Sequence, residues 1–367
     1  MRRGIRATPS PKCHQNVREG DNVHVGDLLS RAARRWPDRP AWIQDETVVS
    51  FREAEERVNR LANGLIRLGI RPGQKVGLLV NNCYQGLETI LAPMKAGMAV
   101  VPMNARLHVN EIQYLLNTTD CSGLVYGRDF KNGIGEIRAS LPKLEHYICI
   151  GATDNDSVEY EELLSTSTQD SPNVSINPGD LAWVFSTSGT TGRPKGAMLS
   201  HRNLLSMAQA FLTDINSAKP EDVLLHAAPI THGSGLSMFH HIARGAANAF
   251  PGTRRFDPPL IFEAIERYGG TTMFMAPTMI NMLVASGLKH KYDLSSLHTV
   301  VYGGGPMYTE HLLHAMDIFG NIFVQIFGQG EAPMTITTLP KEEHVIGDDP
   351  DRLRRLGSAG REVTGVR

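Results

Sequence analysis

The chain has 367 residues, of which 41% are hydrophobic and 20% charged, the balance of a globular protein with a sizeable core. Its 37 Lys and Arg residues nearly cancel its 38 Asp and Glu residues, so the net charge of −1 argues against a general nucleic-acid binder. The 4 cysteines form no Cys-x-x-Cys pair, which makes a disulfide framework or a zinc ribbon a poor interpretation and favours a reducing, cytoplasmic compartment.

The first 20 residues are basic and lack the apolar stretch of a secretory signal. We expect residues 1–20 to be a disordered basic leader, with a transit peptide as the alternative. The chain contains no run of about 20 apolar residues, so we expect no transmembrane segment.

Residues 21–178 predict helices that alternate with short apolar strands. The spacing of Val58, Leu61 and Leu65 places these side chains on one face of a helix. Residues 151–178 are polar and rich in turn-forming residues, and predict a connection over the surface. The expected helices are 27–36, 51–68, 85–95 and 111–116, and the expected strands are 75–80, 99–103, 123–126 and 147–150.

The alternation resumes over residues 179–341, which we expect to form a second subdomain. The expected strands are 181–185, 223–228, 271–275, 299–302 and 322–327, and the expected helices are 202–212, 236–244, 262–268, 277–285 and 309–319. Repeated βα units predict parallel sheets with helices on both faces. The fold class is therefore α/β, with two doubly wound, mostly parallel sheets flanked by helices.

The most informative segment is residues 185–196, with the sequence FSTSGTTGRPKG. Its glycines let backbone N–H groups converge on an anion, its hydroxyls add donors, and Arg193 and Lys195 add positive charge. The segment is not a Walker A loop, because Lys195 is followed by Gly196 instead of Ser or Thr. We interpret it as a phosphate-binding loop; a flexible polar surface loop is the alternative.

Residues 187–196 match, at every fixed position, the Thr-Ser-Gly-Thr-Thr-Gly-x-Pro-Lys-Gly signature of the acyl-adenylate-forming (AMP-binding) enzymes. The chain thus resembles this family, which includes acyl-CoA synthetases, firefly-type luciferases and adenylation domains of peptide synthetases. The resemblance implies that the loop grips the β- and γ-phosphates of ATP. The implied loop contacts are Thr187, Ser188, Gly189, Thr190, Thr191, Gly192 and Lys195.

Residues 229–235, PITHGSG, resemble the family's next motif. The resemblance implies that His232 lies beside the reacting carboxylate and the α-phosphate, with a purely structural histidine as the alternative. We expect Gly233 and Gly235 to leave open space through which a substrate tail can pass.

Two further segments resemble the family's adenine and metal motifs. In the Tyr-Gly-Gly-Gly-Pro turn, the implied adenine contacts are Gly303, Gly304, Gly305 and Pro306. In residues 325–331, QIFGQGE, the implied nucleotide contacts are Gln325, Phe327, Gly328 and Gln329. Phe327 would stack on adenine and Glu331 would be the ligand of Mg²⁺. Gly330 stands where the family has Thr, which removes a hydroxyl near the metal.

The resemblance covers roughly residues 24–361, within one AMP-binding domain expected over 21–367. The family's later Thr-Gly-Asp and its small C-terminal domain have no counterpart in the sequence. We therefore expect residues 342–367 to be the start of a truncated, β-barrel-like third subdomain, and the whole chain to be a shortened form with little activity.

The function implied by the resemblance is that of an AMP-forming acid–thiol ligase, with ATP, Mg²⁺ and CoA as cofactor and co-substrates. The catalytic residues would be His232, Lys195 and Glu331. The expected partner is a small-molecule carboxylic acid, by default a long- or medium-chain fatty acid. The resemblance leaves room for a homodimer. The alternatives are a ligase for aryl acids, a catalytically incompetent module that binds nucleotide or acyl groups, and, least supported, a kinase.

Overall fold

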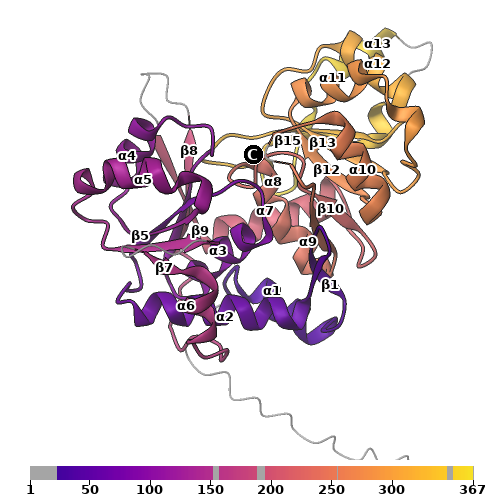
Figure 1. Cartoon of the computed structure of the whole chain (residues 1–367). Coiled ribbons are helices and arrows are strands. Elements are labelled where there is room, and N and C mark those ends of the chain that lie inside the picture. The colour runs from indigo at the N-terminus through magenta and orange to yellow at the C-terminus, as the bar shows by residue number, and fades with distance from the viewer. Residues whose placement is uncertain (1–22, 152–156, 188–194, 254, 345–349, 367) are drawn as a thin grey trace, which may run out of the picture.

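The computed structural model describes residues 23–151, 157–187, 195–253, 255–344 and 350–366. These residues form two sheets with helices packed on their faces (Figure 1). The expected leader, residues 1–20, lies outside the described residues. None of the helices within the described ranges is long and apolar enough to cross a membrane.

The seven-stranded sheet has the order β7-β6-β5-β3-β4-β8-β9, and every neighbouring pair is parallel except the β8–β9 hairpin. Its strands are β3 (Lys75–Leu79), β4 (Ala99–Pro102), β5 (Cys121–Gly127), β6 (His146–Ile150), β7 (Val158–Glu159), β8 (Leu181–Thr187) and β9 (Lys195–Ser200). All four residues of β4 are buried, as expected for a strand covered on both faces.

The nine-stranded sheet has the order β16-β15-β14-β13-β12-β10-β11-β1-β2 and is parallel from β14 to β1, with antiparallel strands at both edges. Its strands are β1 (Pro40–Gln44), β2 (Thr47–Ser50), β10 (Val223–Leu225), β11 (Ala247–Phe250), β12 (Thr272–Met275), β13 (Thr299–Tyr302), β14 (Phe323–Phe327), β15 (Thr337–Leu339) and β16 (Arg361–Glu362). The expected class, two doubly wound and mostly parallel sheets, is confirmed.

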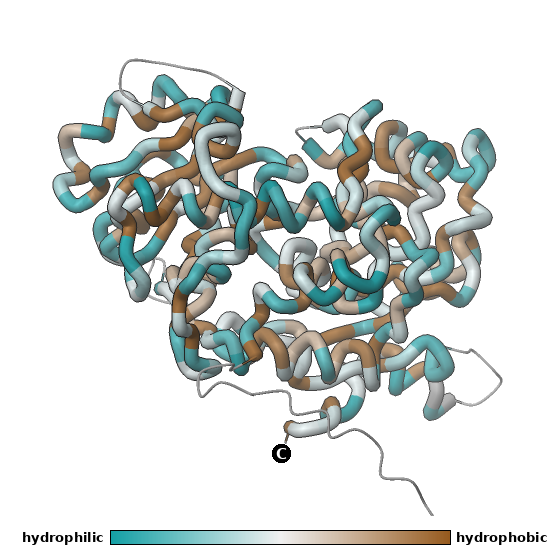
Figure 2. Tube along the Cα trace, turned by 90° about the horizontal axis from the view of Figure 1, so that it is seen from below, coloured by the Kyte–Doolittle hydropathy of each residue, from teal (hydrophilic) through white to brown (hydrophobic). Residues whose placement is uncertain are grey.

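Three apolar cores lie between the layers of helices and sheets. The central core contains α1 (Asp27–Arg35), α2 (Phe51–Arg67), α3 (Tyr84–Lys95), α7 (His201–Asp214) and α9 (Met238–Arg244), and packs against both sheets. The outer face of the seven-stranded sheet is covered by α4 (Val109–Thr118) and α5 (Lys131–Ile137). The outer face of the nine-stranded sheet is covered by α10 (Pro258–Tyr268), α11 (Pro277–Ser286) and α12 (Thr309–Phe319). Figure 2 shows apolar segments concentrated between these layers.

The remaining elements are short. They are α6 (Tyr160–Ser165), α8 (Gly233–Leu236), α13 (Pro350–Leu356) and the 3₁₀ turns η1 (Arg128–Phe130), η2 (Arg138–Ser140), η3 (Lys289–Lys291) and η4 (Lys341–His344). Residues 157–178 do more than connect two elements, because α6 buries Tyr160 and Leu163 against α2. Tertiary packing thus orders a segment whose polar composition indicated a surface loop.

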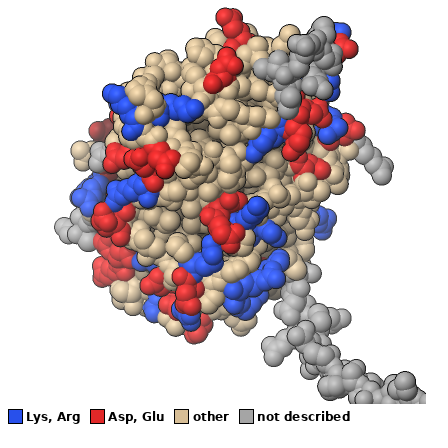
Figure 3. Space-filling view, turned by 90° about the vertical axis from the view of Figure 1, so that its right-hand side faces the viewer, with Lys and Arg blue, Asp and Glu red and all other residues tan. Residues whose placement is uncertain are grey.

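The two sheets do not follow the expected division of the chain at residue 178. The early β1–β2 hairpin joins the nine-stranded sheet through β11, and the later β8–β9 hairpin joins the seven-stranded sheet through β4. Beyond residue 341, β16 pairs with β15 and extends the nine-stranded sheet, and the described residues there form no closed barrel. On the face drawn in Figure 3, acidic and basic side chains alternate without a large region of one sign.

Candidate active site

The candidate site lies at the point where the strand order of the nine-stranded sheet reverses, between β10 and β12. Strands β10 and β12 are neighbours, but the chain leaves β10 towards β11 and leaves β12 towards β13. In open α/β sheets a crevice forms at such a point, outside the carboxyl ends of the strands. A cavity of about 370 Å³ occupies this position. Its 18 lining residues are Asn104, Phe185, Ala228, Pro229, His232, Gly233, Leu236, Phe274, Ala276, Met279, Gly303, Gly304, Ile326, Gly328, Gln329, Gly330, Pro333 and Met334.

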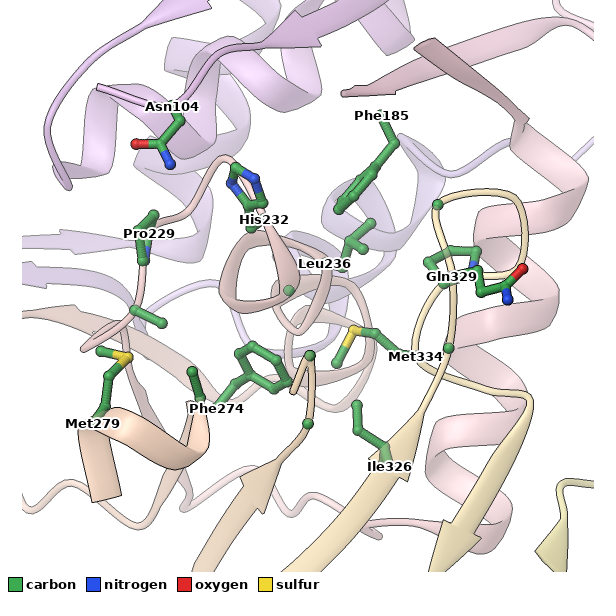
Figure 4. A pocket seen from close by; sticks show the side chains of 18 residues that line it. Asn104, Phe185, Pro229, His232, Leu236, Phe274, Met279, Ile326, Gln329 and Met334 are labelled. Atoms are coloured by element: carbon green, nitrogen blue, oxygen red, sulfur yellow. The ribbon is translucent and has the colours of Figure 1, made fainter. Parts of the chain in front are cut away.

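The cavity also involves the seven-stranded sheet. Asn104 follows β4 and Phe185 lies on β8, and both face His232 across the upper part of the cavity in Figure 4. The rings of Phe185 and His232 meet edge to face, with 5.6 Å between their centres. This contact brings the β8–β9 hairpin, which carries the phosphate-loop signature, to the cavity.

His232 is held between the two sheets as a neutral imidazole. Its Nδ1 lies 3.1 Å from the Oγ1 of Thr231, and its backbone N–H donates to the carbonyl of Pro229. Burial lowers the pKa of His232 below 6.5, so the ring carries no charge at neutral pH. Its ring N–H can therefore donate a hydrogen bond to a carboxylate or phosphate oxygen without adding positive charge.

Asn82 anchors the segment that leads to His232, a role that the sequence analysis missed. Its Nδ2 donates to the carbonyls of His226 and Ala228, both at 2.8 Å, and its Oδ1 accepts from the N–H of Ile230. Asn82 comes just after β3 of the other sheet. A polar residue at the carboxyl end of a buried strand was the signal that could have indicated it.

The glycines after β10 do not leave the open space that we expected, and this interpretation was wrong. A Cβ on Gly235 would lie 1.8 Å from the carbonyl oxygen of Ile230. A Cβ on Gly233 would lie 2.5 Å from Cε1 of Phe274. Both glycines are therefore close-packing positions, and the space beside Gly233 is filled by an aromatic ring.

The glycine turn after β13 combines close packing with an open face. A Cβ on Gly303 would lie 2.6 Å from the carbonyl oxygen of Ile326 on the next strand. Gly304 has a φ of +78° and no atom within 4 Å of the position of its missing Cβ. Gly305 and Pro306 are exposed. The turn thus presents backbone without side chains to the cavity. A flat ring such as adenine could pack directly against it.

Strand β14 and the turn that follows it place the predicted site residues in different surroundings. Gln329 lines the cavity, whereas Phe327 is 42% exposed and is not among the lining residues. Gln325 points away from the cavity lining, and its Oε1 accepts a hydrogen bond from the hydroxyl of Tyr302 at 3.3 Å. Gly328 passes so close to Met334 that a Cβ would lie 2.2 Å from the backbone nitrogen of Met334.

The two predicted charged residues are exposed and do not line the cavity. Glu331 is exposed in the turn that follows Gly330. Lys195 is exposed at the start of β9, where it pairs in register with Thr187 of β8. The tip of this hairpin, which includes Ser188, Gly189, Thr190, Thr191 and Gly192, lies outside the described residues. The structure therefore describes both ends of the predicted phosphate loop, Thr187 and Lys195.

The character of the cavity is apolar and uncharged. None of the 18 described residues that line it is Lys, Arg, Asp or Glu, and the polar side chains among them are Asn104, His232 and Gln329. Within the described ranges, no group of three or more His, Cys, Asp or Glu residues forms a metal cage. A ligand held here would place uncharged surface in the cavity and any phosphate towards the hairpin.

Comparisons with known proteins point in one direction. Residues 29–367 match the AMP-binding enzyme family. The chain is 31% identical to a feruloyl-CoA synthase of an Amycolatopsis species, over 92% of this chain and 64% of that protein. It is 28% identical to the medium/long-chain-fatty-acid–CoA ligase FadD8 of Mycobacterium tuberculosis, over 91% of this chain and 59% of that protein.

A solved structure supports the fold independently. The N-terminal domain of FACL13 from Mycobacterium tuberculosis superimposes with a TM-score of 0.83 at 24% identity, covering 93% of this chain and 82% of that one. The chain spans less than two thirds of the length of the two relatives named above.

Proposed function

The chain belongs to the AMP-binding enzyme family, and we propose that it activates a carboxylic acid with an uncharged tail, using ATP to form an acyl adenylate and releasing pyrophosphate. The observation that carries this proposal is the contact between Phe185 and His232. Phe185 lies two residues before Thr187 on the strand that leads into the phosphate-loop signature. His232 opens into the apolar cavity. One site can therefore receive a phosphate chain from one side and an acid from the other.

In this proposal the nucleotide lies across the glycine turn. The exposed backbone of Gly304 and Gly305 and the ring of Pro306 face one side of adenine, and Phe327 and Gln329 approach it from β14. Gly303 and Gly328 allow the strands to come close enough for this. Gln325 acts indirectly, because its contact with Tyr302 fixes the two strands that carry the turn.

The phosphates would be held by the hairpin tip. Thr187, Ser188, Gly189, Thr190, Thr191 and Gly192 supply hydroxyl and backbone donors, and Lys195 supplies positive charge. Donors placed where negative charge develops stabilise the transition state of the transfer. The neutral ring of His232 would orient the attacking carboxylate.

Glu331 fits a magnesium ion that is bound jointly with the nucleotide. Mg²⁺ is commonly held by one or two carboxylates together with phosphate oxygens and water, so an exposed lone carboxylate suffices. When bound, the ion neutralises charge on the phosphates. Glu331 lies in the same turn as Gln329, at the rim where the phosphate chain would emerge.

The acid would carry an apolar tail. The fatty acid expected by default is consistent with the similarity to FadD8, and an aryl acid is the second candidate because of the similarity to a feruloyl-CoA synthase. In the second half of the reaction, the thiol of CoA would attack the acyl carbonyl and displace AMP.

The test is exchange of labelled pyrophosphate into ATP by the 367-residue chain, with a panel of straight-chain and aromatic acids. Exchange that depends on the acid supports adenylation. ATP binding without exchange, measured by calorimetry on the same preparation, would favour the alternative of a binding module. Absence of both would contradict the proposed function.

A further inference from the structure

Gly233 and Phe274 are in contact across the point where the strand order reverses, between β10 and β12. Gly233 begins α8 after β10, and Phe274 lies near the end of the neighbouring strand β12. These strands pair through Leu224–Thr272 and Leu225–Met273. Phe274 therefore lies just beyond the last paired residue, where the crevice opens.

The ring of Phe274 occupies the volume that a side chain at position 233 would need. A Cβ on Gly233 would lie 2.5, 2.6 and 3.1 Å from Cε1, Cζ and Cδ1 of the ring. Contacts below 3.0 Å are not tolerated, so residue 233 can be only glycine while the ring stays where it is. Phe274 also packs against the central core and is only half-buried, with its free side on the cavity.

The surroundings of the ring make it the wall of an apolar compartment. Leu236, Met279 and Met334 line the same cavity, and Figure 4 shows Phe274 between Met279 and Met334, opposite Asn104 and His232. A ring fixed by packing on the backbone of α8 resists displacement by a ligand, because moving it would open a void in the core.

The size of the cavity limits what can enter. Ligand pockets generally measure about 300–1,000 Å³. At about 370 Å³ this cavity lies near the lower end of that range, and it extends to Gly303, Gly304 and Gln329, where the nucleotide is proposed to bind. The tail of the acid must therefore fit into the part of the cavity that the nucleotide does not occupy.

We propose that Phe274, packed against the Cα of Gly233, sets the depth of the acyl compartment and restricts the substrate to a carboxylic acid with a compact, uncharged tail, such as one aromatic ring or a short chain. The inference rests on the proposed adenylation function and narrows its substrate class. It assigns to Phe274 the exclusion of long acyl chains.

The test uses stable sulfamate analogues of the acyl adenylate, one with a benzoyl tail and one with a dodecanoyl tail, with AMP as the ligand without a tail. Dissociation constants are measured by calorimetry on the full chain. We expect the parent protein to bind the benzoyl analogue at least tenfold more tightly than the dodecanoyl analogue. Phe274→Ala and the milder Phe274→Leu should reduce or reverse this preference by at least tenfold and leave the affinity for AMP unchanged.

A paired substitution tests the contact itself. Gly233→Ala should push the ring into the cavity and weaken binding of both acyl analogues at least tenfold, with little effect on AMP. Adding Phe274→Ala should restore binding to the level of Phe274→Ala alone. If Gly233→Ala weakens binding of the acyl analogues and the double variant binds them just as weakly, the role of the Gly233–Phe274 contact is contradicted.

The possible results distinguish a failure of the role assigned to Phe274 from a failure of the proposed adenylation function. If the parent chain binds AMP and the analogues but keeps the same tail preference in both Phe274 variants, the role of Phe274 is overturned and the proposed function stands. The same holds if the parent chain prefers the dodecanoyl analogue. If the folded parent chain binds neither AMP nor any analogue, the proposed function fails and the inference falls with it. Thermal melting confirms that each variant is folded.

Discussion

At the scale of single residues, the proposed site separates its charged groups from its apolar ones. His232 is half-buried and neutral, and the cavity beside it is lined by uncharged residues. Lys195 and Glu331 are exposed and lie outside the cavity lining. This arrangement suits a reaction in which the phosphates stay near water and the acid tail leaves it. The charges of Lys195 and Glu331 should therefore determine the affinity for the nucleotide.

Substituting Lys195 by Ala should weaken ATP binding roughly tenfold to a hundredfold, because a charge-assisted hydrogen bond contributes about 1.5–3 kcal/mol. The fold should be unaffected, since the side chain is exposed. Calorimetry with ATP measures the effect. The control is Lys143→Ala, at an exposed lysine that precedes β6 and pairs with Asp120, just before β5. Equal affinities of parent and Lys195→Ala proteins would exclude Lys195 from the phosphate site.

Replacing Glu331 by Gln keeps the shape of the side chain and removes its charge. If Glu331 holds Mg²⁺, the affinity for ATP should fall in the presence of magnesium and change little in the presence of EDTA. Nucleotide titrations under both conditions measure the difference. The exposed Glu46, paired with Arg267, supplies the matched control, Glu46→Gln. A loss of the same size with and without magnesium would indicate that Glu331 has a structural role.

At the scale of elements, one partly buried ionic network joins three helices. From α2, Arg57 Nε donates to Glu88 Oε1 on α3 at 2.6 Å, and Arg57 Nη2 donates to Glu161 Oε1 on α6 at 2.7 Å. The hydroxyl of Tyr160 donates to the other oxygen of Glu88. Glu88 is fully buried, and burial raises its pKa against the opposing effect of Arg57. The network explains how the polar segment containing α6 becomes part of the fold.

Arg57→Met should lower the free energy of unfolding by about 3–5 kcal/mol, because it leaves the buried carboxylate of Glu88 without its cation. Urea unfolding followed by fluorescence measures the change. The double variant Arg57→Met/Glu88→Leu should recover much of the loss, since no buried charge remains. Arg52→Met removes a solvent-exposed pair with Asp38 and should change stability little. An equal loss in the single and double variants would contradict the interpretation.

At the scale of the whole molecule, buried histidines couple stability to pH. Burial lowers the pKa of His226 to about 3 and the pKa values of His201 and His241 to about 4. Above about pH 7 these histidines are neutral in both the folded and the unfolded state. Below about pH 6.5 the unfolded chain binds protons that the folded protein does not, so stability falls with pH until the folded pKa values are reached.

We expect each of these histidines to cost about 1 kcal/mol of stability at pH 5.5 relative to pH 7.5. The measurement is urea unfolding at both pH values, reported by the buried Trp42 and Trp183. Among the described residues, neither ring nitrogen of the buried His240 has a hydrogen-bond partner. His240→Leu should therefore stabilise the protein and reduce its pH dependence. An unchanged pH dependence in this variant would exclude His240 from the effect.

The sequence by itself determined the identity of most elements and the family of the chain. Apolar spacing in residues 51–68 predicted α2, and the order of residues in 187–196 predicted a phosphate loop, because both signals are local. The sheet to which each hairpin belongs was decided only by tertiary structure. So was the wall of the cavity, since Gly233 suggested open space until the fold placed Phe274 against it. The physical reason is that strand pairing and close packing depend on residues far apart in the chain, which local patterns do not encode.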